Sequence, residues 1–290
     1  MAEEVAHLIF DVESVSDGEL IAKVRYTGEA LTPEEAIGRY QQELLEQKGS
    51  TFIPHTYQIP IAVVIAKVAA DFRLIDIVSL DEPEFRSHVM TEHFWRGWEA
   101  YKRPQWVTFN GRSFDIPLME LSAYRYGISL PKWFSGDGYK SPRNRFNLHS
   151  HLDLQELLTN HGAARLNGGL NLAAQMLGKP GKVGLTGEQV QQKFAEGDLK
   201  AISDYCRCDV LDTYFVFLRC MLLTGQLDRE TELTLVAEAK TWVEQRADRC
   251  EAYAAYLGHW GDWRDPWASP PEGSDGLAAR SPAPEASRQA

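Results

Sequence analysis

HLIFDVES, from His7 to Ser14, is the stretch of sequence that decides the expected fold. Its apolar residues end at Phe10 and predict a buried strand over residues 6–10. Asp11 and Glu13 follow two residues apart, and residues two apart on an extended chain project from the same face. Facing carboxylates repel each other unless a divalent cation lies between them, and their hard oxygen atoms suit Mg²⁺ or Mn²⁺. The pattern therefore indicates a cation site, with a pair of solvated acids at the strand end as the alternative.

A further acid, Asp115, lies in VTFNGRSFDIPLM near the middle of the chain. Residues 105–109 predict a short strand, and the pair Asn110-Gly111 predicts a turn after it. The apolar spacing that follows predicts a helix with Asp115 in its first turn. The helix macrodipole favours a carboxylate there, so an ordinary capping acid is the competing interpretation.

The stretch AISDYCRCDVLDTYFVFLRCMLL, residues 201–223, is apolar, lacks Pro and Gly, and predicts a long helix. Tyr205 and Asp209 are separated by one helical turn and therefore share a face of that helix. A phenol in this position can hydrogen-bond an attacking water while the carboxylate holds a metal. The alternative is a surface Asp beneath a half-buried Tyr. Asp204 and Asp212 fall on other faces of the helix and are expected to be solvent-facing acids.

The stretches FDVES, TFNGRSFDIP and YCRCD resemble, in this order, the motifs of the DEDD superfamily of 3′–5′ exonucleases. They resemble in particular its DEDDy branch, whose last motif is Y-x-x-x-D, and a stand-alone exonuclease domain of family B DNA polymerases. The resemblance covers about residues 6–223 and fills every motif position, although Ser14 stands where that polymerase group often has Thr. It implies an α/β fold of the ribonuclease H-like type, a mixed five-stranded sheet flanked by helices.

The resemblance implies a metal-dependent 3′–5′ exonuclease that removes nucleotides from single-stranded 3′ ends by two-metal-ion hydrolysis of phosphodiester bonds. Two divalent ions, Mg²⁺ or Mn²⁺, are the implied cofactors. Tyr205 is expected to orient the attacking water, because a phenol with a pKa near ~10 is a poor base at neutral pH. The implied metal ligands are Asp11, Glu13, Asp115 and Asp209, and with Tyr205 they form the implied catalytic set.

Contacts to the terminal sugar and base are implied for the Val12 backbone and for the side chains of Asn110 and Phe114, which lie beside the motif acids. His149, His151 and Asp153 lie in the segment between the middle and last motifs. A structural or solvent-facing role is expected for all three.

Acidic residues outnumber basic ones by 41 to 30, so the net charge is −11. This charge argues against non-specific binding along long duplexes. An acidic protein can still bind a short single strand through a few local phosphate contacts. The loop GKPGKVG carries Lys179 and Lys182, and its backbone amides and charge could take a phosphate. We therefore expect Lys182 to contact the substrate, with an ordinary solvated loop as the alternative.

Two other functions stay open. The fold could serve as a weakly active or non-catalytic binding module in a DNA repair or replication assembly, although the full carboxylate set argues against this. The protein could also trim RNA, because the motifs do not distinguish the two nucleic acids. A bulky residue close to the terminal ribose would favour DNA, and we expect DNA to be favoured over RNA.

The composition is that of a globular protein. The chain has 290 residues, of which 44% are hydrophobic, and it can bury one substantial core. No apolar run is long enough to span a bilayer, and the four cysteines lack the spacing of a zinc site. We expect a reduced, cytoplasmic protein that does not associate with membranes.

The predicted organisation begins with an exonuclease domain over residues 1–225, which includes a helical insertion at about 28–50 with Thr32 as its N-cap. Residues 226–257 predict a C-terminal helix that packs on the core, on a protein partner or on a second copy. Residues 258–290 contain a Trp cluster, expected to pack back onto the domain, and a disordered Pro-, Ser- and Ala-rich tail. Other expected elements are strands at 61–69, 74–80 and 146–148 and helices at 82–101, 152–158, 170–177 and 186–195.

Overall fold

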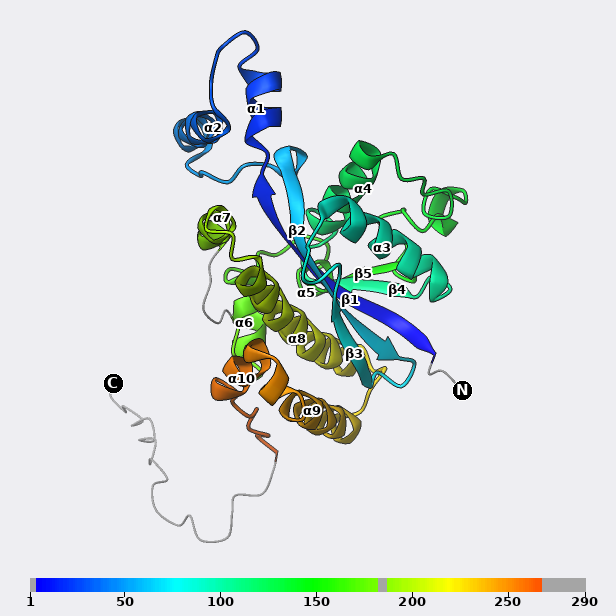
Figure 1. The fold of residues 1–290 in the computed structure, drawn as a ribbon. Helices are drawn as coiled ribbons and strands as arrows, with labels where there is room; N and C mark the ends of the chain where they lie inside the picture. The colour runs from blue at the N-terminus through cyan, green and yellow to red at the C-terminus, as the bar shows by residue number, and fades with distance from the viewer. Residues whose placement is uncertain (1–3, 182–186, 268–290) are drawn as a thin grey trace, which may run out of the picture.

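Five strands form one mixed sheet at the centre of the protein, in the order β3-β2-β1-β4-β5 (Figure 1). The structure is a computed structural model that describes residues 4–181 and 187–267. β1 pairs antiparallel with β2 and parallel with β4, so it is the central strand. The predicted α/β fold of the ribonuclease H-like type, with a mixed five-stranded sheet, is confirmed. The strands are β1 (Val5–Ser16), β2 (Gln58–Ala69), β3 (Leu74–Ser79), β4 (Gln105–Thr108) and β5 (His151–Asp153).

Helices cover both faces of this sheet (Figure 1). α8 packs across β1 and β2 on one face, and α6, α9 and α10 pack against α8. α3 and α4 cover the opposite face. The helices are α1 (Gly18–Arg25), α2 (Pro33–Lys48), α3 (Ser87–Ala100), α4 (Asp115–Tyr126), α5 (Leu154–Leu158), α6 (Gly169–Gln175), α7 (Gly187–Ala195), α8 (Leu199–Leu223), α9 (Arg229–Glu244) and α10 (Glu251–Gly258).

The side chains of β1 alternate between these two layers. Leu8, Phe10 and Val12 lie in the apolar cluster beneath α3 and α4, which is rich in aromatic rings. Ile9 lies in the opposite cluster, which is built around α8. Because residues two apart on a strand share a face, the side chains at positions 11 and 13 also face α8. The central strand therefore separates an aromatic core from a layer that contains the acids.

β1 is longer than the sequence predicts. It continues six residues beyond the predicted end at Phe10, because β2 pairs with it as far as the contact of Ser16 with Gln58. Asp11 and Glu13 thus lie within the strand and not after it. The predicted hairpin of β2 and β3 is confirmed, and both of its strands differ from the predicted ranges by only a few residues.

The edge strand lies later in the chain than predicted. Residues 146–148 lie outside any strand, and the side chains of Phe146 and Leu148 are 57% and 39% exposed. β5 instead pairs in parallel with β4 through the buried residues His151 and Asp153. The ring Nε2 of His151 lies 2.8 Å from the hydroxyl of Thr108, so its polar group is satisfied inside the protein. The prediction is wrong because the polar residues His151 and Asp153 suggested a loop. In the folded protein their side chains are hydrogen-bonded, so this segment can form a buried strand.

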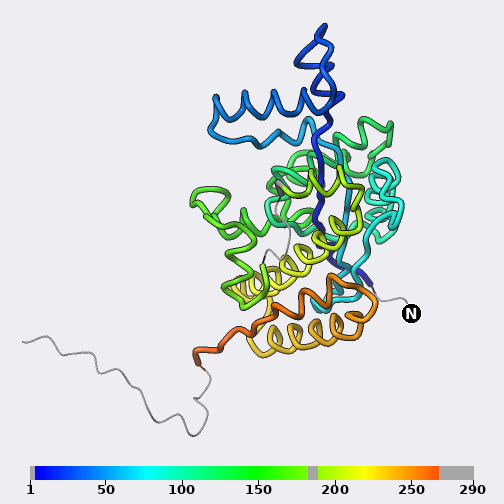
Figure 2. The backbone as a smooth tube through the Cα atoms, turned by 60° about the vertical axis from the view of Figure 1, so that its left-hand side comes forward, coloured from blue at the N-terminus to red at the C-terminus, as the bar shows by residue number. Residues whose placement is uncertain are grey.

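An insertion between β1 and β2 stands beyond the end of β1, at the opposite end of the molecule from α9 (Figures 1 and 2). Its second helix, α2, begins as predicted, with Thr32 and Glu35 forming a capping box. The sequence did not predict α1. The two helices approach closely at Gly18, where Pro33 leaves no room for a Cβ atom. They share a small core of their own, formed by Ile21, Tyr26, Ala36, Tyr40, Leu44 and Ile53.

The C-terminal part of the described chain contains two helices where one was predicted, because a turn at residues 245–250 separates α9 from α10. Both pack into the cluster around α8, and Trp260 joins them with its ring 5.1 Å from that of Phe215. Trp260 thus packs back onto the domain as expected, whereas Trp267 is 73% exposed. The predicted disordered tail beyond residue 267 lies outside the described residues. Among the helices of residues 4–181 and 187–267, none is both long and apolar enough to cross a bilayer.

Asp212 differs from its predicted solvent-facing position. α10 covers that side of α8, so Asp212 is fully buried and accepts a hydrogen bond of 2.6 Å from the hydroxyl of Tyr256. Burial raises the pKa of its carboxyl from 3.8 to about 7. Asp204 is closer to the expectation, since it is half-buried and pairs with Lys200 at 2.6 Å.

Asp212→Asn is expected to flatten the pH dependence of stability. Because the folded pKa of Asp212 is raised to about 7, the native protein binds this proton more tightly than the unfolded chain does. Its contribution is therefore complete below the unfolded pKa and is lost as the pH rises toward 7, at up to about 1.4 kcal/mol per pH unit. Urea unfolding across this range should show a steeper decline for the wild type than for the variant.

Tyr256→Phe provides the matched comparison. The hydrogen bond from Tyr256 lowers the pKa of Asp212, so its removal should extend the declining range to higher pH. Equal slopes for the wild type and Asp212→Asn would show that Asp212 does not titrate in this range.

Candidate metal centre and active site

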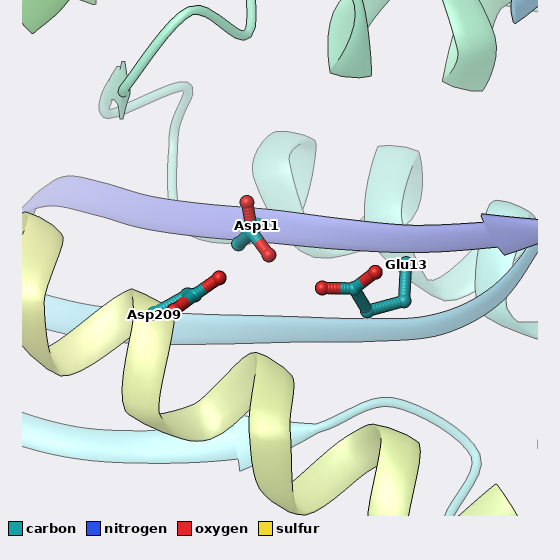
Figure 3. Close-up of side chains that lie close together, drawn as sticks. All are labelled: Asp11, Glu13 and Asp209. Atoms are coloured by element: carbon teal, nitrogen blue, oxygen red, sulfur yellow. The ribbon is translucent and has the colours of Figure 1, made fainter. Parts of the chain in front are cut away.

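Asp11 and Glu13 of β1 lie opposite Asp209 of α8 (Figure 3). The strand alternation that turns Ile9 toward α8 places the two β1 acids on the same side. One oxygen from each of the three carboxylates can be chosen so that all lie within 4.8 Å of one another. Asp11 and Glu13 are half-buried, and Asp209 is 9% exposed.

Two local features set the position of these elements. The pairing of β1 with β2 shifts register between Glu13 and Ser14, and such a bulge re-aims the neighbouring side chains of a strand. On α8, the hydroxyl of Ser203 lies 2.8 Å from that of Ser79 at the end of β3, and both are buried. α8 is therefore fixed against the sheet less than two turns before Asp209.

The carboxylate trio fits a divalent cation. Two like charges about 4 Å apart repel by about 4 kcal/mol at an effective dielectric constant of about 20, so three carboxylates this close are unfavourable by themselves. A cation reverses the sign of that energy. The donor set consists of oxygen atoms only, which suits Mg²⁺ or Mn²⁺ and not the softer metals that prefer nitrogen or sulfur.

Asp115 lies beside this trio without belonging to it. It is the first residue of α4 and is only 5% exposed, so it is not an ordinary solvated capping acid. Its pKa is raised well above the ordinary value, first by burial and then by the negative charge of Asp11. A hydrogen bond from the Val12 backbone acts in the opposite direction. Asp115 thus interacts electrostatically with Asp11 of β1.

The turn between β4 and α4 positions Asp115. Asn110 has a φ of 68°, and a Cβ at Gly111 would lie 2.6 Å from the Cβ of Thr108, so this turn requires glycine there. The carboxylate of Asp153 accepts hydrogen bonds from the backbone amides of Asn110 at 3.0 Å and Arg112 at 2.9 Å. Asp153 therefore has a structural role, as does His151.

Tyr205 lies on the same face of α8 as Asp209, as the spacing predicted, and is 6% exposed. Burial raises the pKa of its phenol well above the ordinary value, and the charge of Asp209 raises it further. A hydrogen bond between the two side chains acts in the same direction. Tyr205 is therefore a permanent hydrogen-bond donor at the edge of the trio.

Cys206 is a site residue that the sequence did not reveal. Its buried thiol lies 3.4 Å from the backbone oxygen of Asp11 and 3.5 Å from the Oδ2 atom of the same residue. Burial and the surrounding carboxylates raise the pKa of the thiol well above its ordinary value, so it remains a donor. Helical spacing could have placed Cys206 near Asp209, which is three residues away, but no pattern marks a thiol for this role.

The predicted substrate contacts have different surroundings. The Val12 side chain is buried in the aromatic core, so only its backbone reaches the site. Asn110 is exposed and Phe114 is half-buried, and both line a pocket of about 390 Å³ next to Asp115. The Oδ1 atom of Asn110 accepts a hydrogen bond of 2.7 Å from the hydroxyl of Ser113.

The predicted phosphate loop is not supported at Lys179. Its side chain is 3% exposed, its Nζ donates to the backbone oxygen of Gly261 at 3.1 Å, and it lies 3.8 Å from the centre of the Trp260 ring. Burial lowers the pKa of Lys179 to about 8. The lysine binds the C-terminal segment because the Trp cluster folds over it. Lys182 lies outside the described residues.

The fold and the acidic cluster together are those of a nuclease with a ribonuclease H-like core. A family model described as predicted 3′–5′ exonuclease related to the exonuclease domain of PolB matches residues 50–260, and the chain belongs to this family. The resemblance to that exonuclease domain is thereby confirmed. The match contains the positions of Asp115, Tyr205 and Asp209 and begins after Asp11 and Glu13. Among curated proteins, the comparison finds no match to the chain.

Asp209→Asn is expected to leave the fold intact or slightly more stable without metal, because it removes one of three mutually repelling charges. The wild type should be stabilised by Mn²⁺, by about 2.7 kcal/mol at a concentration of about 100 times Kd. The variant should lose most of that effect. Thermal unfolding with and without Mn²⁺ measures both quantities.

Asp204→Asn is the control for this measurement. Asp204 lies on the same helix but pairs with Lys200 outside the trio, so its replacement should preserve the response to Mn²⁺. An Asp209→Asn protein that Mn²⁺ stabilises as strongly as the wild type would contradict the assignment of Asp209 as a ligand.

Proposed function

We propose that this protein is a metal-dependent 3′–5′ exonuclease that removes nucleotides from single-stranded 3′ ends, with DNA as the favoured substrate. The observation that carries the proposal is the convergence of Asp11, Glu13 and Asp209, with ligand oxygens within 4.8 Å, from two separate elements. Membership of a family of predicted 3′–5′ exonucleases supports nuclease chemistry at this site.

The proposed cofactors are two divalent ions, Mg²⁺ or Mn²⁺. When bound, they would supply positive charge for the scissile phosphate, an activated water and stabilisation of the leaving 3′ oxygen. Asp11, Glu13 and Asp209 are the residues that would hold them, and Asp115 would contribute from the start of α4. Overall, water adds across the P–O3′ bond and leaves a 3′-hydroxyl on the shortened strand and a free nucleoside 5′-monophosphate.

Tyr205 is proposed to orient the attacking water. Its raised pKa keeps the phenol protonated at neutral pH, so it can donate a hydrogen bond but cannot accept the proton of the water. The hydrogen bond to Asp209 places its hydroxyl at the carboxylate trio, and because a phenol has one O–H, this donor would turn from Asp209 to the water once Asp209 holds a cation. Cys206 is proposed to hold Asp11 in position through its thiol.

A preference for DNA is supported by the residues around Asp115. The half-buried ring of Phe114 directly precedes that acid, and we propose that it lies beside the terminal sugar of the bound strand. Discrimination against RNA depends on contacts at the 2′ position, where a bulky ring leaves little space for a hydroxyl. We also propose a reducing compartment such as the cytoplasm, supported by four free cysteines.

A time course on 5′-labelled single-stranded DNA and RNA of the same sequence tests the proposal. With Mg²⁺ or Mn²⁺, the wild type should produce a ladder that shortens from the 3′ end, faster on DNA. EDTA should abolish it, and Asp11→Ala should slow it by at least about 100-fold, as expected when a group that stabilises the transition state is removed. Intact strands under every metal condition would favour a binding module in a repair or replication assembly.

Tyr205→Phe should reduce kcat by about 100-fold, because a misplaced reacting water is costly. KM and the stabilisation by Mn²⁺ should change little, since the metal ligands are retained. The control is Tyr124→Phe, because Tyr124 is 86% exposed on α4 and its hydroxyl lies outside the site. An unchanged kcat for Tyr205→Phe would remove Tyr205 from the mechanism.

A further inference from the structure

The pocket of about 390 Å³ beside Asp115 has walls from two parts of the chain. One wall is the turn before α4, with Asn110, Ser113 and Phe114. The other wall is the end of the insertion, where α2 leads into β2, and consists of Leu44, Lys48, Ser50, Phe52, Pro54 and His55. The α1 and α2 helices lie before residue 50, where the exonuclease family match begins, whereas Phe52 and His55 lie within the match.

Aromatic rings dominate the space between these walls. The ring of Phe52 lies 5.8 Å from that of Phe114, and the ring of His55 lies 6.2 Å from it. Phe52 is nevertheless 60% exposed, although an apolar ring in water is unfavourable. Its neighbour Ile53 is 3% exposed in the core of the insertion, so the backbone that carries Phe52 is anchored. The exposed ring is therefore presented from a backbone that the core of the insertion holds in place.

The charge of this pocket differs from that of the acidic site beside it. Among the described residues, its lining contains no Asp or Glu, and the titratable residues are Lys48 and His55. A negatively charged strand can therefore approach this pocket without the repulsion that the carboxylates exert. The pocket neighbours the site along the chain, because its lining residue Phe114 directly precedes Asp115 at the start of α4.

We propose that Phe52 and His55, both carried by the insertion, form with Phe114 a stacking platform for the unpaired bases at the 3′ end of the substrate. Every base has a π face, so aromatic platforms of this kind bind single strands with little sequence preference. A base inside a duplex has both faces covered by its neighbours and must be unstacked before it can use the platform. The insertion thus makes the enzyme selective for unpaired ends. This inference rests on the proposed exonuclease function.

Phe52→Ala tests the platform without disturbing the core, because the side chain is largely exposed. The loss of one stacked base should raise KM, and the Kd for a single-stranded oligonucleotide, by about tenfold. The value of kcat should stay within about twofold, because stacking on a ring outside the trio binds ground state and transition state alike. The matched control is Phe134→Ala, since Phe134 is 57% exposed and does not line the pocket.

A substrate that lacks its terminal base separates stacking from other effects. The wild type should bind and cut a strand with an abasic 3′ terminus about tenfold less well than the intact strand, because it loses the stacked ring. Phe52→Ala should show little difference between the two strands. A purely structural role of Phe52 would weaken both strands equally.

The outcomes separate this inference from the function on which it rests. A wild type that cuts single strands, beside a Phe52→Ala protein with unchanged KM, Kd and discrimination against the abasic end, would overturn the platform alone. A wild type that neither cuts nor binds single strands would overturn the proposed function and the platform together. A wild type that binds without cutting, and loses affinity in Phe52→Ala, would support the platform and reject the exonuclease.

Discussion

Electrostatic repulsion among Asp11, Glu13 and Asp209 is the constraint on which the rest of the structure depends. Their oxygens lie within 4.8 Å, and apolar packing does not reduce the repulsion between charges brought this close. Rigid elements must hold them together: β1 is paired on both sides, and α8 is buried along most of its length. A cation placed between the acids adds attractive contacts that outweigh this repulsion. The arrangement that destabilises the metal-free fold is therefore the same arrangement that binds the cation.

Two neighbours of the acids are donors without charge. Tyr205 and Cys206 are both buried, and burial together with the neighbouring carboxylates raises their pKa values and keeps them protonated. Neutral donors orient the carboxylates while leaving their negative charge available to a cation. On the other side of β1, the rings of Phe94 and Trp106 stack 4.4 Å apart. They belong to the apolar cluster that supports the strand carrying Asp11 and Glu13.

The sequence predicted the parts of this structure that follow from periodicity and failed where tertiary contacts decide. Asp11 and Glu13 share a face because of strand alternation, and Tyr205 and Asp209 share a face because of helical spacing. The buried position of Asp212 could not be predicted, because α10 covers it only in the folded chain. The edge strand was misplaced, and α1 was missed, because pairing with β4 and packing on α2 stabilise segments whose own patterns are weak.

β1 carries Asp11 and Glu13 and leads directly into Asp17, the N-cap of α1. One strand therefore forms part of the acidic site and also supports the insertion. A residue added or removed between Phe10 and Asp11 would turn the side chains on one side of that point to the other face. Either the carboxylates would then meet the aromatic core or Phe10 would face α8. The connection between α1 and α2 has no such register. The acids of β1 therefore depend on the exact length of that strand, whereas the connection between α1 and α2 can be lengthened or shortened without moving them.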